Sequence, residues 1–179
     1  GTDGAVVLGV FCLSYSINSA YMKHILVMGA GKSSTSLIEY LLSNASAENG
    51  HVHVADVQLQ AAEKKIAGHP GATAYGINPD DQDETNRLIA LSDLVISLLP
   101  PHLHLQTAQK CLAAGKHFLN ASYVSPEMQA MDTEAKSKGL TFLCEMGLDP
   151  GIDHMSAMEI MDKIRSRGGK INSFRSHCG

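Results

Sequence analysis

The sequence predicts an α/β protein with a doubly wound parallel sheet, followed by the start of a second, α+β domain. From Lys23 to about Glu145, short apolar runs alternate with amphipathic stretches. A turn of the form Gly29-x-Gly31 directly follows the first apolar run. Residues 94–99 are continuously apolar, which is typical of a strand buried on both faces of a parallel sheet. Strict alternation of strands and helices favours helical crossovers between parallel strands, so we expect a sheet of the Rossmann type.

The first half of this region is expected to hold three strands and two helices. Residues 25–28 form the first apolar run, and the glycine turn separates them from an amphipathic helix over about 33–42. Within residues 51–55, β-branched valines alternate with other residues, and the run ends at Asp56. This alternation predicts the second strand. A helix over about 58–67 and a weaker third strand over 72–77 follow.

The second half is expected to add three further strands. Residues 80–91 are predicted to be helical, because acidic side chains in a first turn interact favourably with the helix dipole. We then expect a strand over 94–99, a helix ending at 114, a strand over 117–121, a helix over 126–138 and a strand over 140–145. Gly115, Gly139 and Gly168 each come just past a predicted helix, where a left-handed residue often caps the end.

The chain is expected to divide into three segments. Residues 1–21 are predicted to be a non-native or disordered extension, because Met22 is a natural start for the first strand. The apolar tract over 5–13 could pass for the hydrophobic region of a signal peptide, but no basic segment precedes it. Residues 22–148 form the nucleotide-binding domain. Residues 149–179 begin a substrate and dimerisation domain with a helix over about 154–167 and a strand from Lys170, and we expect this second domain to be incomplete.

Composition favours a cytoplasmic globular protein. The formal net charge is −4, and hydrophobic residues make up 44% of the chain with no apolar run of transmembrane length. An anionic membrane or a nucleic acid requires clustered Lys and Arg, so neither partner is expected. The cysteines are far apart and form no CxxC pair, which predicts reduced thiols and no metal site. They are Cys12, Cys111, Cys144 and Cys178.

The glycine turn indicates a phosphate-binding loop. The first glycine of such a turn permits its tightness, and the second lets a pyrophosphate approach backbone N–H groups at a helix N-terminus. The match is partial, because Ser34 occupies the place of a third glycine, and an ordinary strand-to-helix turn is the alternative. Gly31-Lys32-Ser33 also resembles the end of a P-loop, but Leu26 stands where that motif needs its first glycine.

Asp56 closes the second predicted strand. An acidic residue at this point of a dinucleotide-binding fold accepts hydrogen bonds from the adenosine ribose. Its charge would repel a 2′-phosphate, so Asp56 favours NAD over NADP. The alternative is an exposed Asp in an ordinary turn.

Three segments together resemble the saccharopine dehydrogenase family of the glutamate-forming type. They are Leu94-Val95-Ile96-Ser97-Leu98-Leu99-Pro100, Ala121-Ser122-Tyr123-Val124-Ser125-Pro126, and Glu145-Met146-Gly147-Leu148-Asp149-Pro150-Gly151-Ile152-Asp153-His154. The resemblance implies an enzyme of lysine metabolism that oxidises the CH–NH bond of saccharopine with NAD or NADP. The products would be glutamate and 2-aminoadipate semialdehyde. The full-length protein would be a homodimer.

The resemblance also implies roles for individual residues. Pyrophosphate would be bound by Gly29, Ala30, Gly31, Lys32, Ser33 and Ser34. The cofactor would further contact Leu99, Pro100, Ser122, Tyr123 and Val124. The substrate would contact Ala121, Ser122 and Asp149.

Two departures from the family pattern bear on these roles. Fungal members that use NADP carry a basic residue just beyond the second strand, where this chain has Asp56-Val57-Gln58. Ala121 stands where a hydroxyl residue is common, which removes one polar contact to substrate.

Asp149 and His154 are the candidate catalytic residues. Asp149 would hold the substrate's ammonium group or accept a proton, although Asp-Pro-Gly is also a good turn by itself. His154 is either an acid–base catalyst or a first-turn helix residue, and Asp153 is predicted to cap that helix. His102 and His104 are expected at the surface or lining the crevice. The series Met155, Met158 and Met161 has helical spacing, which predicts core packing.

Two other functions stay open at this point. One is a carboxynorspermidine or homospermidine synthase, which also acts on a C–N linkage with NAD(P). The other is a module that senses nucleotides without catalysis.

Overall fold

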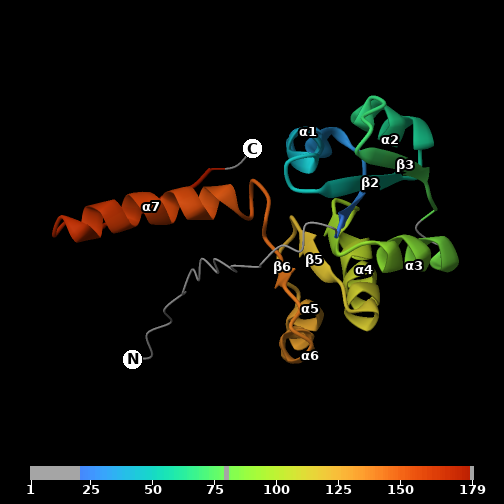
Figure 1. The fold of residues 1–179 in the computed structure, drawn as a ribbon. Helices are drawn as coiled ribbons and strands as arrows, with labels where there is room; N and C mark the ends of the chain where they lie inside the picture. Colours follow the sequence, from blue (N-terminus) through green and yellow to red (C-terminus); the bar gives the residue numbers. More distant parts are fainter. Residues whose placement is uncertain (1–20, 79–80, 178–179) are drawn as a thin grey trace.

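The structure, a computed structural model, describes residues 21–78 and 81–177 and contains one six-stranded parallel sheet (Figure 1). The strand order is β3-β2-β1-β4-β5-β6, so the direction of strand addition reverses between β1 and β4. The strands are β1 (Lys23–Met28), β2 (Gly50–Asp56), β3 (Ala72–Gly76), β4 (Leu94–Ser97), β5 (His117–Asn120) and β6 (Phe142–Leu143). In open sheets of this kind, ligands bind beyond the carboxyl ends of the strands at such a reversal. The predicted fold class is confirmed.

Helices cover both faces of the sheet. The helices are α1 (Thr35–Ala45), α2 (Leu59–Ile66), α3 (Gln82–Leu91), α4 (Pro101–Ala114), α5 (Pro126–Ala130), α6 (Asp132–Ser137) and α7 (Ile152–Ser166), with a 3-10 turn η1 (Lys32–Ser34) before α1. Successive residues of a strand point to opposite faces. Val27 of β1 therefore packs in the core beneath α1 and α2, whereas Leu26 and Met28 pack in the core beneath α3 and α4.

The predicted helix over 126–138 is in fact two helices. Met131 interrupts it, ending α5 and preceding α6. Asp132 and Thr133 follow the break, and both residue types favour helix ends because their side chains compete for backbone hydrogen bonds. The strand after α6 is also shorter than the predicted 140–145. It ends early because Glu145 has a φ of +62°, a left-handed conformation that cannot continue a strand.

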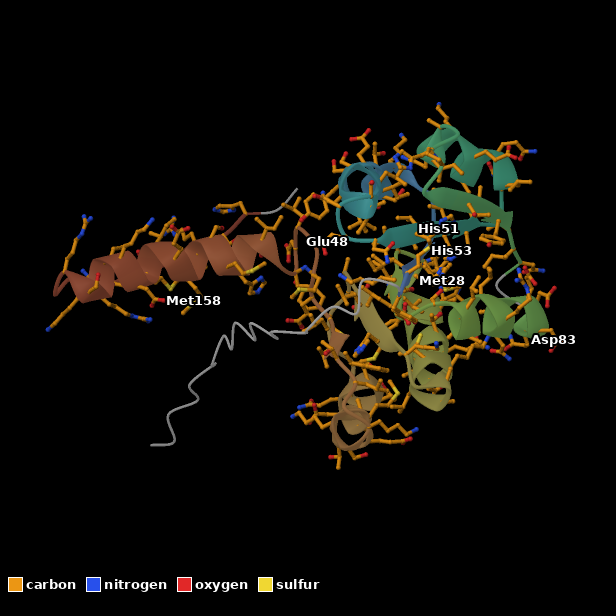
Figure 2. The ribbon with its side chains drawn as sticks, viewed as in Figure 1. Met28, Glu48, His51, His53, Asp83 and Met158 are labelled. Carbon is orange, nitrogen blue, oxygen red and sulfur yellow. The ribbon has the colours of Figure 1, made fainter. Side chains whose placement is uncertain are left out.

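Three predictions for the C-terminal segment are wrong. The last helix starts at Ile152 with Gly151 as its N-cap, so Asp153 lies inside the helix and does not cap it. Residues 170–177 do not form the predicted strand. Helix α7 extends away from the sheet and buries none of its residues (Figure 1). Met155 is 50% exposed and Met158 48% exposed, so the methionine series does not pack in a core within the described chain. Figure 2 shows Met158 on α7, away from the sheet.

Other predictions agree with the structure or lie outside it. Gly115, Gly139 and Gly168 have φ values of +68°, +67° and +75°, so the predicted left-handed conformation at all three is confirmed. The predicted extension lies outside the described residues, except that the Tyr21 hydroxyl donates to Asp93 Oδ1 at 2.6 Å. No helix in the described ranges is both long and apolar enough to cross a membrane.

Three histidines gather on the face of the sheet that α3 covers. The ring nitrogens His24 Nδ1 and His53 Nε2 are 2.9 Å apart, and His53 Nδ1 is 3.2 Å from the Tyr75 hydroxyl. His51 lies beside His53 on β2, with the ring centroids 4.8 Å apart (Figure 2). His53 is almost fully buried. Burial, reinforced by the charges of His51, His24 and Arg87, lowers the pKa of His53 to about 4.

This histidine cluster predicts a loss of stability in mild acid. The pKa of His53 is 6.5 in the unfolded chain and about 4 in the fold, so between these values the unfolded state binds more protons. The stabilisation is fully present above about pH 6.5 and is lost as the pH falls through about 4. We expect the free energy of unfolding to decrease by on the order of 2–3 kcal/mol over this window. Urea unfolding at a series of pH values measures the decrease.

Two variants separate this effect from general acid denaturation. His53→Gln keeps hydrogen-bonding groups but does not titrate, so its stability should depend less on pH in this window. His102→Gln removes an exposed histidine and should retain the wild-type pH dependence. Equal slopes for the wild type and His53→Gln would contradict the assignment to His53.

Candidate active site at the carboxyl edge of the sheet

Gly29 allows the end of β1 to lie directly against the end of β4. Its φ is +106°, a region that L-residues with a side chain rarely adopt. A Cβ on Gly29 would be 2.8 Å from the carbonyl oxygen of Leu98, closer than real Cβ contacts. The tight turn therefore requires glycine at this position for the protein's own packing.

Gly31 has no such structural requirement. Its φ is −67°, which any residue adopts, and a Cβ placed on it would meet no atom within 4 Å. The space beside its backbone is open, so a phosphate group can approach the main chain there. This geometry fits the second glycine of a dinucleotide-binding turn, whose role is to admit the ligand.

A basic pocket of about 590 Å³ opens beside the turn. Three lysines outnumber one carboxylate in its lining, which includes Ala30, Gly31 and Lys32 from the turn, Glu39 from α1, and Lys64 and Lys65 from α2. These positive charges complement the two negative charges of a pyrophosphate. The other predicted turn residues lie differently: Ser33 is exposed, whereas Ser34 is buried and its hydroxyl donates to the Gly31 carbonyl at 2.8 Å.

Asp56 joins the end of β2 to the glycine turn. Its Oδ2 accepts a hydrogen bond from the Ala30 N–H at 2.7 Å, and its Oδ1 accepts one from the Gln58 N–H at 2.9 Å. The carboxylate thus fixes the glycine turn, whereas the sequence predicted only that it would bind the adenosine ribose. Each oxygen of a carboxylate has a second lone pair, so both can also accept from ribose hydroxyls.

A second pocket, of about 390 Å³, lies beyond the ends of β4 and β5. Ala121, Ser122, Tyr123 and Asp149 all line it, although Asp149 comes from a different loop. The structure therefore brings together the residues that were predicted to contact substrate. His104 and Asn120 line the same pocket.

Hydrogen bonds hold the two loops of this second pocket together. The Tyr123 hydroxyl donates to Asp149 Oδ1 at 2.8 Å, and this bond is the main cause of the raised pKa of Tyr123. Asn120 is almost fully buried, and its Oδ1 accepts from the Ser122 N–H at 3.2 Å. The Asn120 carbonyl accepts from the Met146 N–H at 3.1 Å. Asp149 Oδ2 has no partner among the described residues, so it can accept a hydrogen bond from an ammonium group.

Apart from the glycine turn and Asp56, four predicted site residues do not line the second pocket. Leu99 packs against the core, and Pro100 is the N-cap residue of α4. The Val124 N–H donates to Glu145 Oε1 at 3.2 Å. His154 Nδ1 is 2.7 Å from Asp153 Oδ1, and this hydrogen bond raises the pKa of His154.

Sequence reasoning missed several residues that line the two pockets. Lys64 and Lys65 are close to the turn only because α2 packs beside α1, which no local pattern reveals. Asn120 was counted only as a strand residue. His104 was not missed, because it was expected at the surface or lining the crevice, and it does line the second pocket.

Comparison with protein families agrees with this geometry. The family profile described as "Saccharopine dehydrogenase NADP binding domain" matches residues 25–143. The profile described as "Saccharopine dehydrogenase C-terminal domain" matches residues 147–179. The chain belongs to the saccharopine dehydrogenase family.

Curated relatives of this family are considerably longer than the chain. Mitochondrial alpha-aminoadipic semialdehyde synthase of Bos taurus is 36% identical over 164 residues, which are 92% of this chain and 17% of the relative. Saccharopine dehydrogenase [NADP(+), L-glutamate-forming] of Pyricularia oryzae is 35% identical over 157 residues, 88% of this chain and 34% of the relative. The chain thus spans about a third or less of these relatives.

The fold of the chain is also similar to that of a solved member of the family. Apo saccharopine dehydrogenase (L-Glu forming) of Saccharomyces cerevisiae superposes with a TM-score of 0.71 at 29% identity, over 84% of this chain and 33% of that chain. An NAD-binding oxidoreductase of Klebsiella pneumoniae, at 22% identity and a TM-score of 0.57, shares the fold. The family and the Rossmann-type sheet are therefore both established.

Proposed function

We propose that the full-length protein containing this chain oxidises the CH–NH bond of saccharopine with NAD(P). The products are glutamate and 2-aminoadipate semialdehyde, and the step belongs to lysine metabolism. The observation that best supports this function is the composition of the second pocket. Asp149 and Pro150 belong to the segment matched by the C-terminal family profile, and the other lining residues belong to the segment matched by the NADP-binding profile. A dehydrogenase needs such a shared pocket, because substrate and nicotinamide must meet there.

Different residues of the chain have different roles in this reaction. The backbone of Gly31 and the nearby lysines hold the pyrophosphate, and Asp56 holds the ribose. The nicotinamide, when bound, would supply the acceptor for the hydride of the substrate carbon. Asp149, held in place by Tyr123, binds the positively charged substrate nitrogen through its free oxygen. Loss of hydride leaves a carbon–nitrogen double bond, and water hydrolyses it to the two products.

The proposal is tested with the full-length protein, saccharopine and NAD(P)⁺. Formation of reduced cofactor together with glutamate supports it, and absence of both overturns it. The chain alone should bind NADH in calorimetric titration without turning over saccharopine, because the remaining two thirds of the fungal relatives' length has no counterpart in it. Turnover by the chain alone would contradict this expectation. A homodimer and a cytoplasmic location complete the proposal, and light scattering and cell fractionation test them.

NAD is the proposed preferred cofactor, because a carboxylate at the end of β2 would repel a 2′-phosphate bound beside it. Asp56→Ser combined with Val57→Arg should shift the ratio of the two dissociation constants toward NADP by about tenfold or more, since one change removes repulsion and the other supplies a partner for the phosphate. Val57 is 67% exposed, so the arginine displaces no packing. Titrations with NAD⁺ and NADP⁺ measure the ratio.

The structure adds a control for this experiment. Because Asp56 also fixes the glycine turn, Asp56→Ser should lower stability by roughly 1–3 kcal/mol, as expected when hydrogen bonds to a charged acceptor are lost. Val57→Arg alone keeps that turn intact and should improve NADP binding only slightly. A strong preference of the unaltered protein for NADP would refute the role assigned to Asp56.

A further inference from the structure

His104 is a buried imidazole at the edge of the substrate pocket. It lies in the first turn of α4 and is only 5% exposed. It lines the same pocket as Tyr123 and Asp149, which come from two other loops. His102, two residues earlier on the same helix, is exposed and does not line this pocket.

One ring nitrogen of His104 is fixed by the protein. Nδ1 is 2.8 Å from the hydroxyl oxygen of Ser97, which is fully buried at the end of β4. The other ring nitrogen, Nε2, has no hydrogen-bond partner among the described residues. Among the described residues, the fully buried side-chain polar atoms without a partner are Thr85 Oγ1 and Asn120 Nδ2, so Nε2 of His104 is not fully buried and is open to solvent. The open space beside His104 is the pocket itself, where a ligand can supply the missing partner.

We propose that His104 is a catalytic residue that accepts the proton which the substrate's secondary ammonium group must lose before hydride can leave the adjacent carbon. This role rests on the proposed function. In this step an N–H bond of the substrate breaks, and an Nε2–H bond of His104 forms. The positive charge moves from the substrate nitrogen to the imidazole, and no electrons are transferred between them. The freed nitrogen lone pair then forms the double bond as the hydride leaves.

The surroundings of His104 suit a proton acceptor. Burial, with a smaller contribution from the charge of His102, lowers the pKa of His104, so its imidazole is neutral near pH 7. When Nδ1–H donates to the Ser97 hydroxyl, Nε2 carries the free lone pair. The titratable groups that line the pocket together with His104 are Tyr123 and Asp149.

The test measures kcat/KM of the full-length protein for saccharopine as a function of pH. His104→Gln keeps a polar side chain of similar reach but cannot accept the proton. It should lower kcat/KM about a hundredfold or more and remove the decrease in kcat/KM on the acidic side. Its dissociation constant for NADH should stay within about twofold of the wild type. His102→Gln is the matched control: it should leave the dissociation constant for NADH and kcat/KM above pH 7 unchanged, and it should move the acidic decrease only slightly to higher pH, because the charge of His102 no longer lowers the pKa of His104.

The other outcomes overturn either the role of His104 alone or the proposed function together with it. An unchanged kcat/KM and pH profile in His104→Gln, with wild-type activity present, overturns the role of His104 alone. No turnover by the unaltered protein overturns the proposed function and this role together. If His104→Gln does not fold, Ser97→Ala replaces it. Loss of the hydroxyl that accepts from Nδ1–H should move the acidic decrease in kcat/KM to lower pH, and an unmoved profile would overturn the role.

Discussion

Gly29→Ala should destabilise the fold by roughly 2–5 kcal/mol, because the new side chain meets both strain and a backbone clash. The φ of +106° disfavours any residue with a Cβ. The added Cβ would be 2.8 Å from the Leu98 carbonyl oxygen and 3.0 Å from its carbonyl carbon. Both are backbone atoms at the end of β4, so they cannot move aside as a flexible side chain can. Urea unfolding monitored by circular dichroism measures the loss.

Gly31→Ala is the matched control two residues away. Its Cβ would meet nothing within 4 Å, and its φ of −67° suits alanine, so stability should stay the same or increase slightly. Affinity for NADH should nevertheless fall by about tenfold or more, because the methyl group occupies space that the pyrophosphate needs. Equal destabilisation by the two substitutions would show that both glycines serve the turn, and the argument for an open phosphate site at Gly31 would fail.

The sheet was predictable because its determinants are local. The apolar runs that became β1, β2 and β4 are bounded by turn residues, and alternation with helices implies parallel strands. The shorter β6 was overestimated, because the left-handed conformation of Glu145 depends on contacts of its loop. Its N–H donates to the Ser122 carbonyl from another part of the chain. The methionines of α7 have helical spacing, which predicts a shared helix face but not whether another part of the protein packs against that face.

The site was predictable in outline for the same reason. The glycine turn and Asp56 each follow a strand, and carboxyl ends of parallel strands meet at one edge of the sheet. The sequence could not reveal that Asp56 accepts from the Ala30 N–H, since this bond spans two strands. Nor could it show that Tyr123 donates to Asp149, because that contact depends on the path of two loops. The sequence pattern therefore predicts which residues lie near the site. Their hydrogen-bond partners depend on side-chain directions in the folded structure, which the pattern does not give.

Asp149→Asn in the full-length protein should lower kcat/KM for saccharopine by about 30- to 1000-fold, on the scale of lost acid–base or charged groups. The asparagine has the size and turn propensity of aspartate. Its Oδ1 can still accept the hydrogen bond that Tyr123 donates at 2.8 Å, so the geometry of the loop is retained. The substitution therefore removes the negative charge that would hold the substrate's ammonium group, and little else.

Cofactor binding separates this role from a general defect. Asp149 lines the pocket beyond β4 and β5, whereas the glycine turn lines the separate basic pocket. The dissociation constant for NADH should thus change by less than about fivefold. Asp162→Asn removes an exposed acid on α7 that lines neither pocket, and its kcat/KM should match the wild type. If kcat/KM is also near normal in Asp149→Asn, Asp149 acts only through turn geometry and does not hold the substrate's ammonium group.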